Sequence, residues 1–301
     1  MKPILKYRGG KSKEYPLYKD YIPTNFETYY EPFLGGGATF FALEPKKAYI
    51  SDINTYLMNF YEEIQKDYYQ VKKELKELQD IYEKNRETFI SNKKANPNER
   101  VFDPNEPLYY ELRKQFNGMS VPEYTFATLY YFINKTAYSG MIRYNSKGEF
   151  NVPYGRYANF NTELLNDNHF NLLQNDITIK NSTYKDSFEL ATKDDFIFLD
   201  PPYDTVFTSY GNEEFTGDFG EGEHRILAND FKNLSSPALM IISETKLIEE
   251  LYREYIQDKY PISYSVNIRN RFKSKANHLV IANYNIFEAN SICNKGEIYS
   301  G

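Results

Sequence analysis

Residues 28–52 read TYYEPFLGGGATFFALEPKKAYISD, and this stretch decides the fold. It predicts a strand ending at Tyr29-Tyr30-Glu31, a glycine turn at Gly35–Gly37, a helix from Ala38 to Leu43 and a second strand from Ala48 to Ser51. Elements in this order form a βαβ unit. Because glycines let the backbone approach a ligand closely, the turn could hold a cofactor, with or without a phosphate.

The remainder of the chain shows two kinds of pattern. From about Asp176 onward, strand-like runs again alternate with helices, whereas the middle is mostly helical and ends in a hairpin pattern. The sequence therefore predicts an α/β protein with a Rossmann-like sheet, formed by residues 1–54 and 171–301. A mostly helical insertion, residues 55–170, is expected to carry a β-hairpin. Strands are expected at 196–199, 238–242 and 279–284, helices at 55–95, 108–116, 123–134 and 247–255, and the hairpin at 143–157.

Composition excludes several classes of protein. No apolar run in the 301 residues approaches the ~20 that a membrane span needs, and Met1–Ile4 lacks the apolar segment of a signal peptide. The single cysteine, Cys293, excludes an internal disulfide, and with three histidines it makes a structural zinc site implausible. We therefore expect a cytoplasmic, globular protein with no metal site and no membrane association.

The charge of the chain is acidic overall but unevenly distributed. A formal net charge of −6 argues against nucleic-acid binding, which usually needs a basic surface. Yet Met1–Lys13 holds five basic residues and no acid, and Arg269–Lys275 holds four. Among the charged residues of 138–157, three are basic and one is acidic. Acidic residues gather in Glu213–Glu223. A local basic face is therefore compatible with the total charge.

The sharpest chemical signal is Asp200-Pro201-Pro202-Tyr203, which directly follows the apolar run Phe196–Leu199. It is thus expected at the carboxyl end of a buried strand, where open α/β sheets place their sites. Asp200 and the Pro201 carbonyl could accept both protons of an adenine amine, and Tyr203 could stack on a flipped base. The prolines restrict φ and stiffen the turn. In isolation the tetrapeptide would equally suit a capped Pro-Pro turn, so other motifs must decide.

A second signal is the motif Glu31–Phe40, with Asp52 at the end of the next predicted strand. A glycine turn before a helix favours negative groups such as the carboxylate of S-adenosylmethionine, and an acid about 20 residues on typically holds ribose hydroxyls. Asp52 could alternatively cap the following helix. A third signal, Lys6–Lys11, is a basic glycine-containing loop that could close over a cofactor, although such segments are more often solvated tails.

Together these motifs resemble the Dam-type DNA adenine-N6 methyltransferases, including relatives from restriction–modification systems and phages. That family has, in order, a Gly-Gly-Lys motif, a Glu-Pro-Phe glycine motif, a target-recognition insertion and Asp-Pro-Pro-Tyr, as this chain does. The blocks Asn134–Asn145 and Gly148–Gly155 look like the recognition hairpin of the family. The resemblance covers most of the chain and is weakest in 65–105 and after 285.

The resemblance implies a role for each matching position. It assigns catalysis to Asp200, Pro201, Pro202 and Tyr203. It assigns contacts with S-adenosylmethionine to Tyr7, Arg8, Gly10, Lys11, Glu31, Phe33, Gly35, Gly37, Asp52, Tyr184 and Asp200. It assigns DNA contacts to Lys6, Tyr138, Ser139, Met141, Arg143, Asn145, Pro153 and Arg156. Lys6 and Arg143 are expected to reach guanine or neighbouring bases, the commonest use of these residue types in the major groove.

The family also suggests the substrate and partners. We expect methylation of duplex DNA with base flipping at GATC or a related GAT-containing site, by a functional monomer, with a cognate restriction endonuclease as a candidate partner. Ser139 stands where the GATC enzymes often have Asn, and the stretch Glu213–Glu223 matches no family pattern. Three alternatives remain open: an RNA adenine methyltransferase, a cytosine-N4 methyltransferase, or a non-catalytic DNA-binding module on the same fold.

Overall fold

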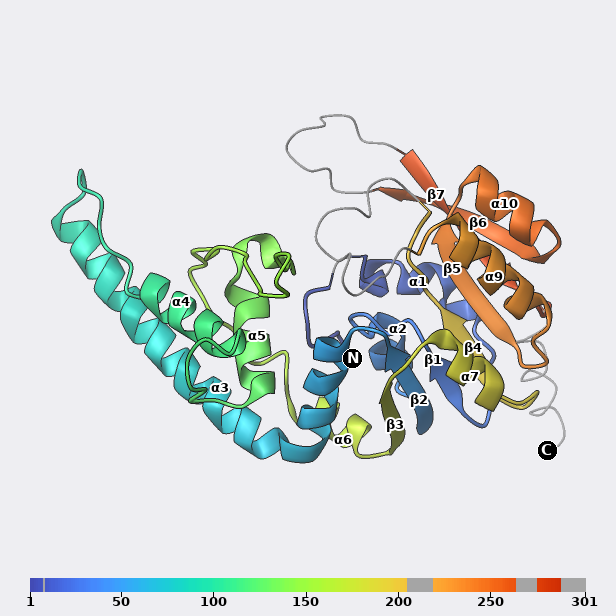
Figure 1. Ribbon diagram of the computed structural model, residues 1–301, viewed down its shortest axis with the longest axis horizontal. Helices are drawn as coiled ribbons and strands as arrows, with labels where there is room; N and C mark the ends of the chain where they lie inside the picture. Colours follow the sequence, from blue (N-terminus) through green and yellow to red (C-terminus); the bar gives the residue numbers. More distant parts are fainter. Residues whose placement is uncertain (8, 205–218, 264–274, 288–301) are drawn as a thin grey trace, which may run out of the picture.

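The computed structural model describes residues 1–7, 9–204, 219–263 and 275–287, and its centre is a seven-stranded sheet (Figure 1). The strand order is β3-β2-β1-β4-β5-β7-β6. The first five strands run parallel, and β7 is antiparallel to both β5 and β6. The strands are β1 (Tyr29–Glu31), β2 (Lys47–Asp52), β3 (Asp176–Asn181), β4 (Phe196–Leu199), β5 (Ala238–Ser243), β6 (Ile256–Ser263) and β7 (Lys275–Ala282).

The direction of strand order reverses between β1 and β4. From β1 the chain proceeds outward to β2 and β3 on one side, whereas β4 and β5 continue on the other. Tyr29 is in register with Phe196 and Tyr30 with Ile197, so the two strands end together. In open α/β sheets, ligands bind outside the carboxyl ends of the strands at such a switch point.

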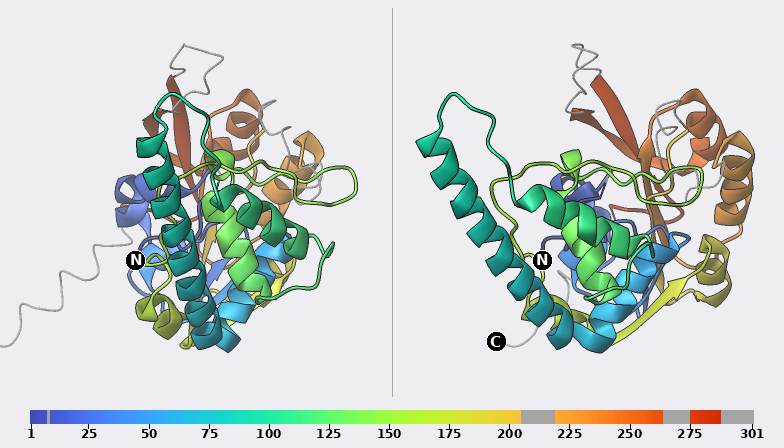
Figure 2. Two further views of the ribbon diagram at one scale, coloured as in Figure 1. Left: turned by 90° about the vertical axis from the view of Figure 1, so that its left-hand side faces the viewer. Right: turned by 60° about the vertical axis from the view of Figure 1, so that its left-hand side comes forward.

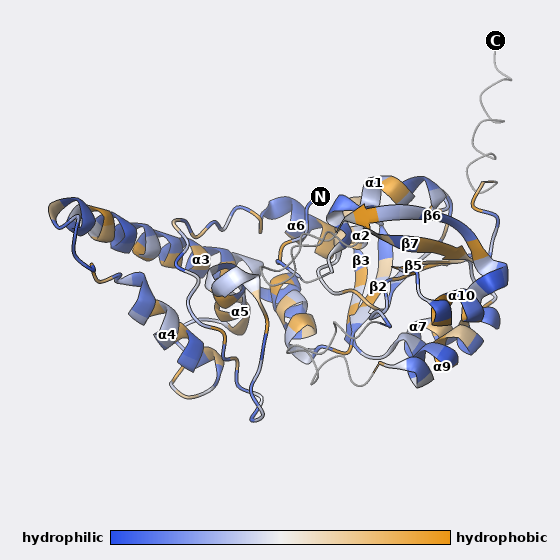
Figure 3. Ribbon diagram, turned by 90° about the horizontal axis from the view of Figure 1, so that it is seen from above, coloured by the Kyte–Doolittle hydropathy of each residue, from blue (hydrophilic) through white to orange (hydrophobic). Residues whose placement is uncertain are grey.

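Alternating side chains of the strands form two cores, one on each face of the sheet. Phe196 and Phe198 join a core that also contains α2 (Ala38–Leu43), whereas Ile197 and Leu199 face α9 (Glu221–Lys232) and α10 (Lys246–Tyr252). β4 is therefore apolar at every position, as expected for a parallel strand covered on both faces. Figure 3 shows hydrophobic residues, in orange, along several of the strands, whereas hydrophilic residues, in blue, prevail on α9.

The middle of the chain forms a helical layer beside the sheet. Its helices are α3 (Thr55–Ala95), α4 (Asn105–Phe116) and α5 (Phe126–Thr136), and α3 extends well away from the sheet (Figure 2). α3 changes direction at Asp67, whose φ of −127° and ψ of 32° are not helical. The aromatic residues of these helices belong to the same core as Phe196 and Phe198, so the hydrophobic interior is continuous from insertion to sheet.

The remaining helical segments of the described residues are short. They are η1 (Lys11–Lys13), α1 (Tyr15–Tyr18), η2 (Lys19–Tyr21), η3 (Tyr138–Gly140), α6 (Asp167–Leu173), α7 (Tyr184–Leu190) and η5 (Arg253–Tyr255). Within the residues described, no helix combines the length and apolarity that crossing a membrane would require.

The predicted α/β fold class is confirmed, and the βαβ unit has almost the predicted bounds. One element is wrong in detail. Residues 143–157 do not form a hairpin of regular strands, because pairing is limited to isolated bridges, Ala137 with Tyr154 and Tyr144 with Phe150. The alternation of Phe150, Val152 and Tyr154 does correspond to burial, since all of them are at most 5% exposed.

Because the core is continuous, we predict that the insertion and the sheet unfold together. Phe132 on α5 is fully buried, and its ring contacts Tyr82, Tyr109 and Phe160, far along the insertion from the sheet. We expect Phe132→Ala to lower the free energy of unfolding by about 3–5 kcal/mol because it leaves a large cavity. Urea unfolding followed by circular dichroism and tyrosine fluorescence should give one coincident transition. Phe132→Leu is the control, with a smaller loss. Two separate transitions would show that the insertion unfolds independently.

Candidate active site

Asp200 emerges from the carboxyl end of β4 and meets Lys11 from the N-terminal segment. The Lys11 ammonium lies 2.9 Å from Asp200 Oδ1 and donates a hydrogen bond to the Tyr203 hydroxyl. Lys11 is 1% exposed, whereas the Asp200 side chain is 22% exposed. Burial raises the pKa of Asp200, and the adjacent Lys11 charge opposes this shift by stabilising the carboxylate. The ion pair with Lys11 thus favours the carboxylate form of Asp200, while part of its side chain stays exposed.

Glu31, at the carboxyl end of β1, is a second acid beside Asp200. It is 2% exposed and accepts a 2.7 Å hydrogen bond from the Tyr29 hydroxyl. Burial, with a smaller contribution from the nearby charge of Asp200, raises the pKa of Glu31 to about 8. Glu31 is therefore mainly neutral at pH 7 and can become charged when a positive group approaches.

The glycine turn joins Glu31 to the predicted ribose-binding acid. Gly35 and Gly37 have φ values of 49° and 66°, in the left-handed region that favours glycine. The Gly35 amide donates a 2.9 Å hydrogen bond to Asp52 Oδ2, and the Asn54 amide donates one to Oδ1. Asp52 thus supports the turn from the end of β2. It does not cap the following helix, because Asn54 caps α3 by accepting from the Leu57 amide.

Tyr7 covers the glycine turn directly. A Cβ atom at Gly35 would lie 3.1 Å from the Tyr7 ring, and one at Gly36 would lie 2.9 Å from its Cβ. Side chains at these positions would therefore displace Tyr7. Next to this contact is a hollow of about 280 Å³. Its lining includes Lys6, Tyr7, Gly10 and Gly36.

Aromatic rings form a wall on the other side of the turn. Phe33 stacks on Tyr184 with ring centroids 5.8 Å apart and contacts Phe219 edge-on at 5.9 Å. The Tyr184 hydroxyl donates to Asp230 at 2.7 Å, which fixes its ring. Flat apolar faces of this kind suit an adenine base.

Tyr203 is supported by residues that the sequence patterns did not identify. Its ring lies edge-on to His278 of β7, with centroids 5.3 Å apart. His278 is fully buried, and its Nδ1 lies 2.6 Å from Glu14, which also accepts from the Tyr260 hydroxyl at 3.0 Å. Burial opposes ionisation of Glu14, but its contacts with His278 and the charge of Lys11 lower its pKa overall. No spacing rule connects positions 264 residues apart.

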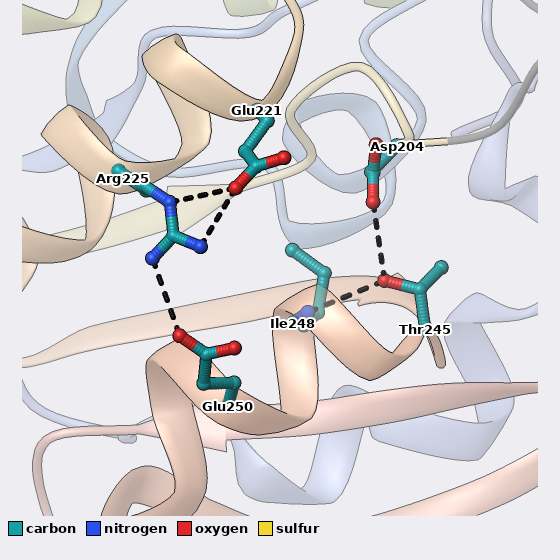
Figure 4. Close-up of polar contacts among 6 residues, drawn as sticks. All are labelled: Asp204, Glu221, Arg225, Thr245, Ile248 and Glu250. Atoms are coloured by element: carbon teal, nitrogen blue, oxygen red, sulfur yellow. Dashed lines mark hydrogen bonds and ion pairs between the residues drawn. The ribbon is translucent and has the colours of Figure 1, made fainter.

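The residue after the motif contacts the helices on the outer face. Figure 4 shows Asp204 Oδ2 at 3.5 Å from the Thr245 hydroxyl, which in turn caps α10 by accepting from the Ile248 amide. In the same view, Arg225 of α9 bridges Glu221 and Glu250 and joins the two helices. The backbone leaving Tyr203 is thereby held close to the start of α10.

The loop that follows α5 places apolar and aromatic side chains outward. Tyr138 is 52% exposed and Met141 is 40% exposed. Ser139 lies between them with φ 56°, a conformation that Asn adopts more readily than Ser. An Asn at this position would thus suit the backbone better than Ser. Lys6 lies against this loop, because a Cβ at Gly140 would be 3.1 Å from Lys6 Cδ.

The other predicted DNA-binding residues differ in how they are held. Arg143 donates to Asn151 Oδ1 at 2.7 Å, whereas Asn145 binds Glu149 and the turn backbone through its amide and carbonyl. Pro153 is exposed, and its carbonyl accepts from the Tyr138 amide at 2.9 Å. Arg156 pairs with Glu106 on α4 at 3.1 Å. The side chain of Asn145 therefore stabilises the turn.

The structure brings the predicted residues together in two groups. The predicted catalytic and cofactor positions gather at the carboxyl ends of β1, β2 and β4, and the predicted DNA-binding positions gather on the loop 138–156 and at Lys6 beside it. Arg8, residues 213–218 of the acidic stretch and most of the basic stretch 269–275 lie outside the described residues. An acidic side chain, the carbonyl of a Pro-Pro turn and an aromatic ring beside a glycine turn suit group transfer to an amine.

Comparison with known proteins gives a consistent result. Residues 7–268 match the family described as D12 class N6 adenine-specific DNA methyltransferase. The chain is 37% identical to the type II methyltransferase M.CviBI of Paramecium bursaria Chlorella virus NC1A, covering 94% of this chain and all of that protein. It is 29% identical to the type II methyltransferase M1.LlaDCHI of Lactococcus lactis (94% and 96% covered) and to the DNA adenine methylase of Haemophilus influenzae (91% of each). The chain therefore belongs to the D12 class of adenine-specific DNA methyltransferases.

Proposed function

We propose that this methyltransferase uses S-adenosylmethionine to methylate the N6 amine of an adenine flipped out of duplex DNA, with GATC or a related GAT-containing site as its target. The observation that carries the proposal is the adjacency of two motifs at the switch point of the sheet. Asp200–Tyr203 leaves the end of β4, and Glu31–Gly37 leaves the end of the neighbouring β1. One strand end can then hold the target base while its neighbour holds the methyl donor.

The chemistry of these residues fits S-adenosylmethionine. Its ammonium and sulfonium are positive, and the buried Glu31 carboxyl can ionise beside them. Asp52 suits the ribose hydroxyls, and the stacked rings of Phe33 and Tyr184 suit the adenine. Tyr7, Gly10, Lys11, Gly35 and Gly37, together with Arg8, complete the proposed site. When bound, S-adenosylmethionine supplies a methyl group activated by attachment to a positive sulfur.

The residues of the motif prepare the amine for attack. The lone pair of an adenine amine is delocalised into the ring, so the nitrogen is a weak nucleophile. Asp200 and the Pro201 carbonyl accept hydrogen bonds from its two N–H groups and thereby favour a tetrahedral nitrogen. The charge of Lys11, 2.9 Å from Asp200 Oδ1, opposes the rise in the pKa of Asp200 that burial causes, and Pro201 and Pro202 limit movement of the turn. Much of the rate then comes from holding two reactants in line.

Tyr203 provides a face for the flipped base. Stacking on an aromatic ring contributes about 1–3 kcal/mol per base, and flipping is required because the N6 atom cannot be reached inside a duplex. The contacts of Tyr203 with Lys11 and His278 fix its ring in advance. Less reordering is then needed when the base arrives.

We assign DNA recognition to the insertion, residues 55–170, and catalysis to residues 1–54 and 171–301. Lys6 and Arg143 read bases, and Tyr138, Ser139, Met141, Asn145, Pro153 and Arg156 contact the duplex around them. The enzyme acts as a monomer. Because relatives are named type II methyltransferases, a restriction endonuclease of matching specificity is a candidate companion.

The direct test is transfer of labelled methyl groups from S-adenosylmethionine to duplex oligonucleotides. We expect label in duplexes that contain GATC and none in duplexes with that adenine replaced. Label in unmethylated genomic DNA but not in GATC duplexes would support the methyltransferase activity and contradict GATC as its target. Absence of label from every DNA tested would contradict the proposed activity.

Replacing the catalytic carboxylate should separate chemistry from binding. We expect Asp200→Ala to reduce kcat by at least the ~10²–10⁴-fold typical of a positioned acid–base group, because the amine then loses an acceptor. Asp200→Asn is the matched control, because it keeps the shape of the side chain and removes only its charge. We expect this variant to retain binding of DNA and S-adenosylmethionine. Single-turnover methylation and filter binding measure the two effects. An active Asp200→Ala enzyme would rule out the assignment.

The pKa of Glu31 predicts a pH dependence of cofactor binding. A carboxyl with a pKa of about 8 is neutral below that pH, so its attraction for a positive ligand grows as pH rises through 8. We expect S-adenosylmethionine to bind more tightly at pH 8.5 than at pH 6.5, with release of a proton. Calorimetry in buffers of different ionisation enthalpy measures that release. The Glu31→Gln variant should bind with a flatter pH profile, and an unchanged profile would remove Glu31 from the site.

Arg143 and Lys147 lie in one loop but should act differently on DNA. Arg143→Ala is expected to reduce discrimination at one base pair by about 1–3 kcal/mol, because it removes a base contact. Lys147→Ala, the control, should weaken binding about equally for all sequences, since we expect this exposed lysine to contact phosphate. Competition assays with single-substituted duplexes measure both effects. Unchanged site preference in Arg143→Ala would exclude it from base reading.

A further inference from the structure

The N-terminal segment is held against the end of α5 by side chains that contact its backbone. Asn134 Oδ1 accepts a 3.0 Å hydrogen bond from the Lys6 amide, and Asn134 Nδ2 donates a 2.8 Å hydrogen bond to the Lys6 carbonyl. A single carboxamide thereby pairs with both polar groups of one residue, as a neighbouring strand would. Only one orientation of the amide satisfies both, so Lys6 is fixed in position along the helix end.

Neighbouring contacts reinforce the same arrangement. Lys135 donates from its ammonium to the Ile4 carbonyl at 2.5 Å, and Asn134 and Lys135 are 2% and 6% exposed. Further back, the His169 ring binds the Lys2 carbonyl at 2.8 Å. The segment that precedes the glycine loop is therefore attached to the insertion at several points, even though it belongs to the sheet side of the molecule in sequence.

The side chain of Lys6 then lies among residues 138–157, the loop to which we assign DNA recognition, called here the recognition loop. Its stem passes over Gly140, where an added Cβ would be 3.1 Å from Lys6 Cδ, and its ammonium is 4.7 Å from the centre of the Tyr157 ring. The residue that follows, Tyr7, covers the glycine turn at Gly35 and Gly36. Consecutive residues thus contact the proposed DNA-binding loop and the proposed cofactor site.

We propose that Asn134 is a specificity-determining positioning residue, which holds the backbone of Lys6 so that its ammonium reaches a base from the edge of the recognition loop. The inference rests on the proposed role of Lys6 in base reading. A lysine side chain is flexible, so it discriminates between bases only if its starting point is fixed. Asn134 provides that fixed point without contacting DNA itself.

The test is a comparison of kcat/KM on the cognate duplex and on duplexes with each base pair of the site substituted. We expect Lys6→Ala to lose discrimination at one base pair by about 5- to 150-fold, the range for a good base contact. Asn134→Ala should lose discrimination at that same base pair and retain it elsewhere. The double variant Lys6→Ala/Asn134→Ala should discriminate no less than Lys6→Ala alone, because Asn134 acts through Lys6.

Two further variants guard against a folding defect. Thr136→Val, the control, removes a buried hydrogen bond within α5, from Thr136 to the Phe132 carbonyl, and should leave every ratio unchanged. Lys135→Met releases the Ile4 carbonyl but keeps the Asn134 contacts, and it should give a smaller loss at the Lys6-dependent base pair. Thermal unfolding of each variant accompanies the kinetics.

Several outcomes would overturn the inference. These are wild-type discrimination in Asn134→Ala, equal loss at every base pair, or a double variant that is worse than Lys6→Ala. No change of any ratio in Lys6→Ala would also overturn it, together with the role of Lys6. Methylation of duplex DNA by the wild-type enzyme would still stand in that case, so the two failures can be told apart.

Discussion

The buried contact between Lys11 and Asp200 constrains the rest of the site. An ammonium that is 1% exposed needs an opposite charge close by, because removing it from water is costly unless it is paired. Asp200 is at the end of β4 and Lys11 precedes α1, so the pair can form only if the N-terminal segment crosses the carboxyl edge of the sheet. That crossing places Tyr7 on the glycine turn and Lys6 against the recognition loop.

The same segment links the two parts of the molecule. Its start is attached to α2, through the amino group of Met1 and Glu44, and its end is attached to the sheet through Lys11. Between them, Asn134 and Lys135 bind it from α5. Since the hydrophobic core is also continuous across the insertion and the sheet, the position of the loop 138–157 relative to Asp200–Tyr203 is set by packing as well as by these polar contacts.

Local patterns predicted the centre of the fold but not its edges. The βαβ unit and β4 have strong apolar runs bounded by glycine or proline, and the observed bounds agree closely. β6 was missed because its sequence, IQDKYPIS, is polar and contains Pro261, which is tolerated at the edge of a sheet. The expected hairpin is reduced to isolated bridges, and Pro153, which has no amide proton, lies next to the bridge of Ala137 with Tyr154. Asp200 was found because it directly follows a strand, whereas Glu14 and His278 meet only in three dimensions.

An acidic total charge is compatible with a DNA substrate, because salt at physiological ionic strength screens charges that lie more than about 8–10 Å apart. A duplex therefore interacts mainly with the charges on the surface nearest to it. Acidic side chains such as Glu221 and Glu250 are used in ion pairs on the outer helices, at the opposite part of the fold from the recognition loop (Figure 1). On the loop side, burial and the charge of Lys6 lower the pKa of Lys135 to about 7, so Lys6 carries its charge beside a partly neutral neighbour. The local field of the loop 138–157 is therefore set by a few basic side chains, of which Lys6 is held through the contacts of Asn134 with its backbone.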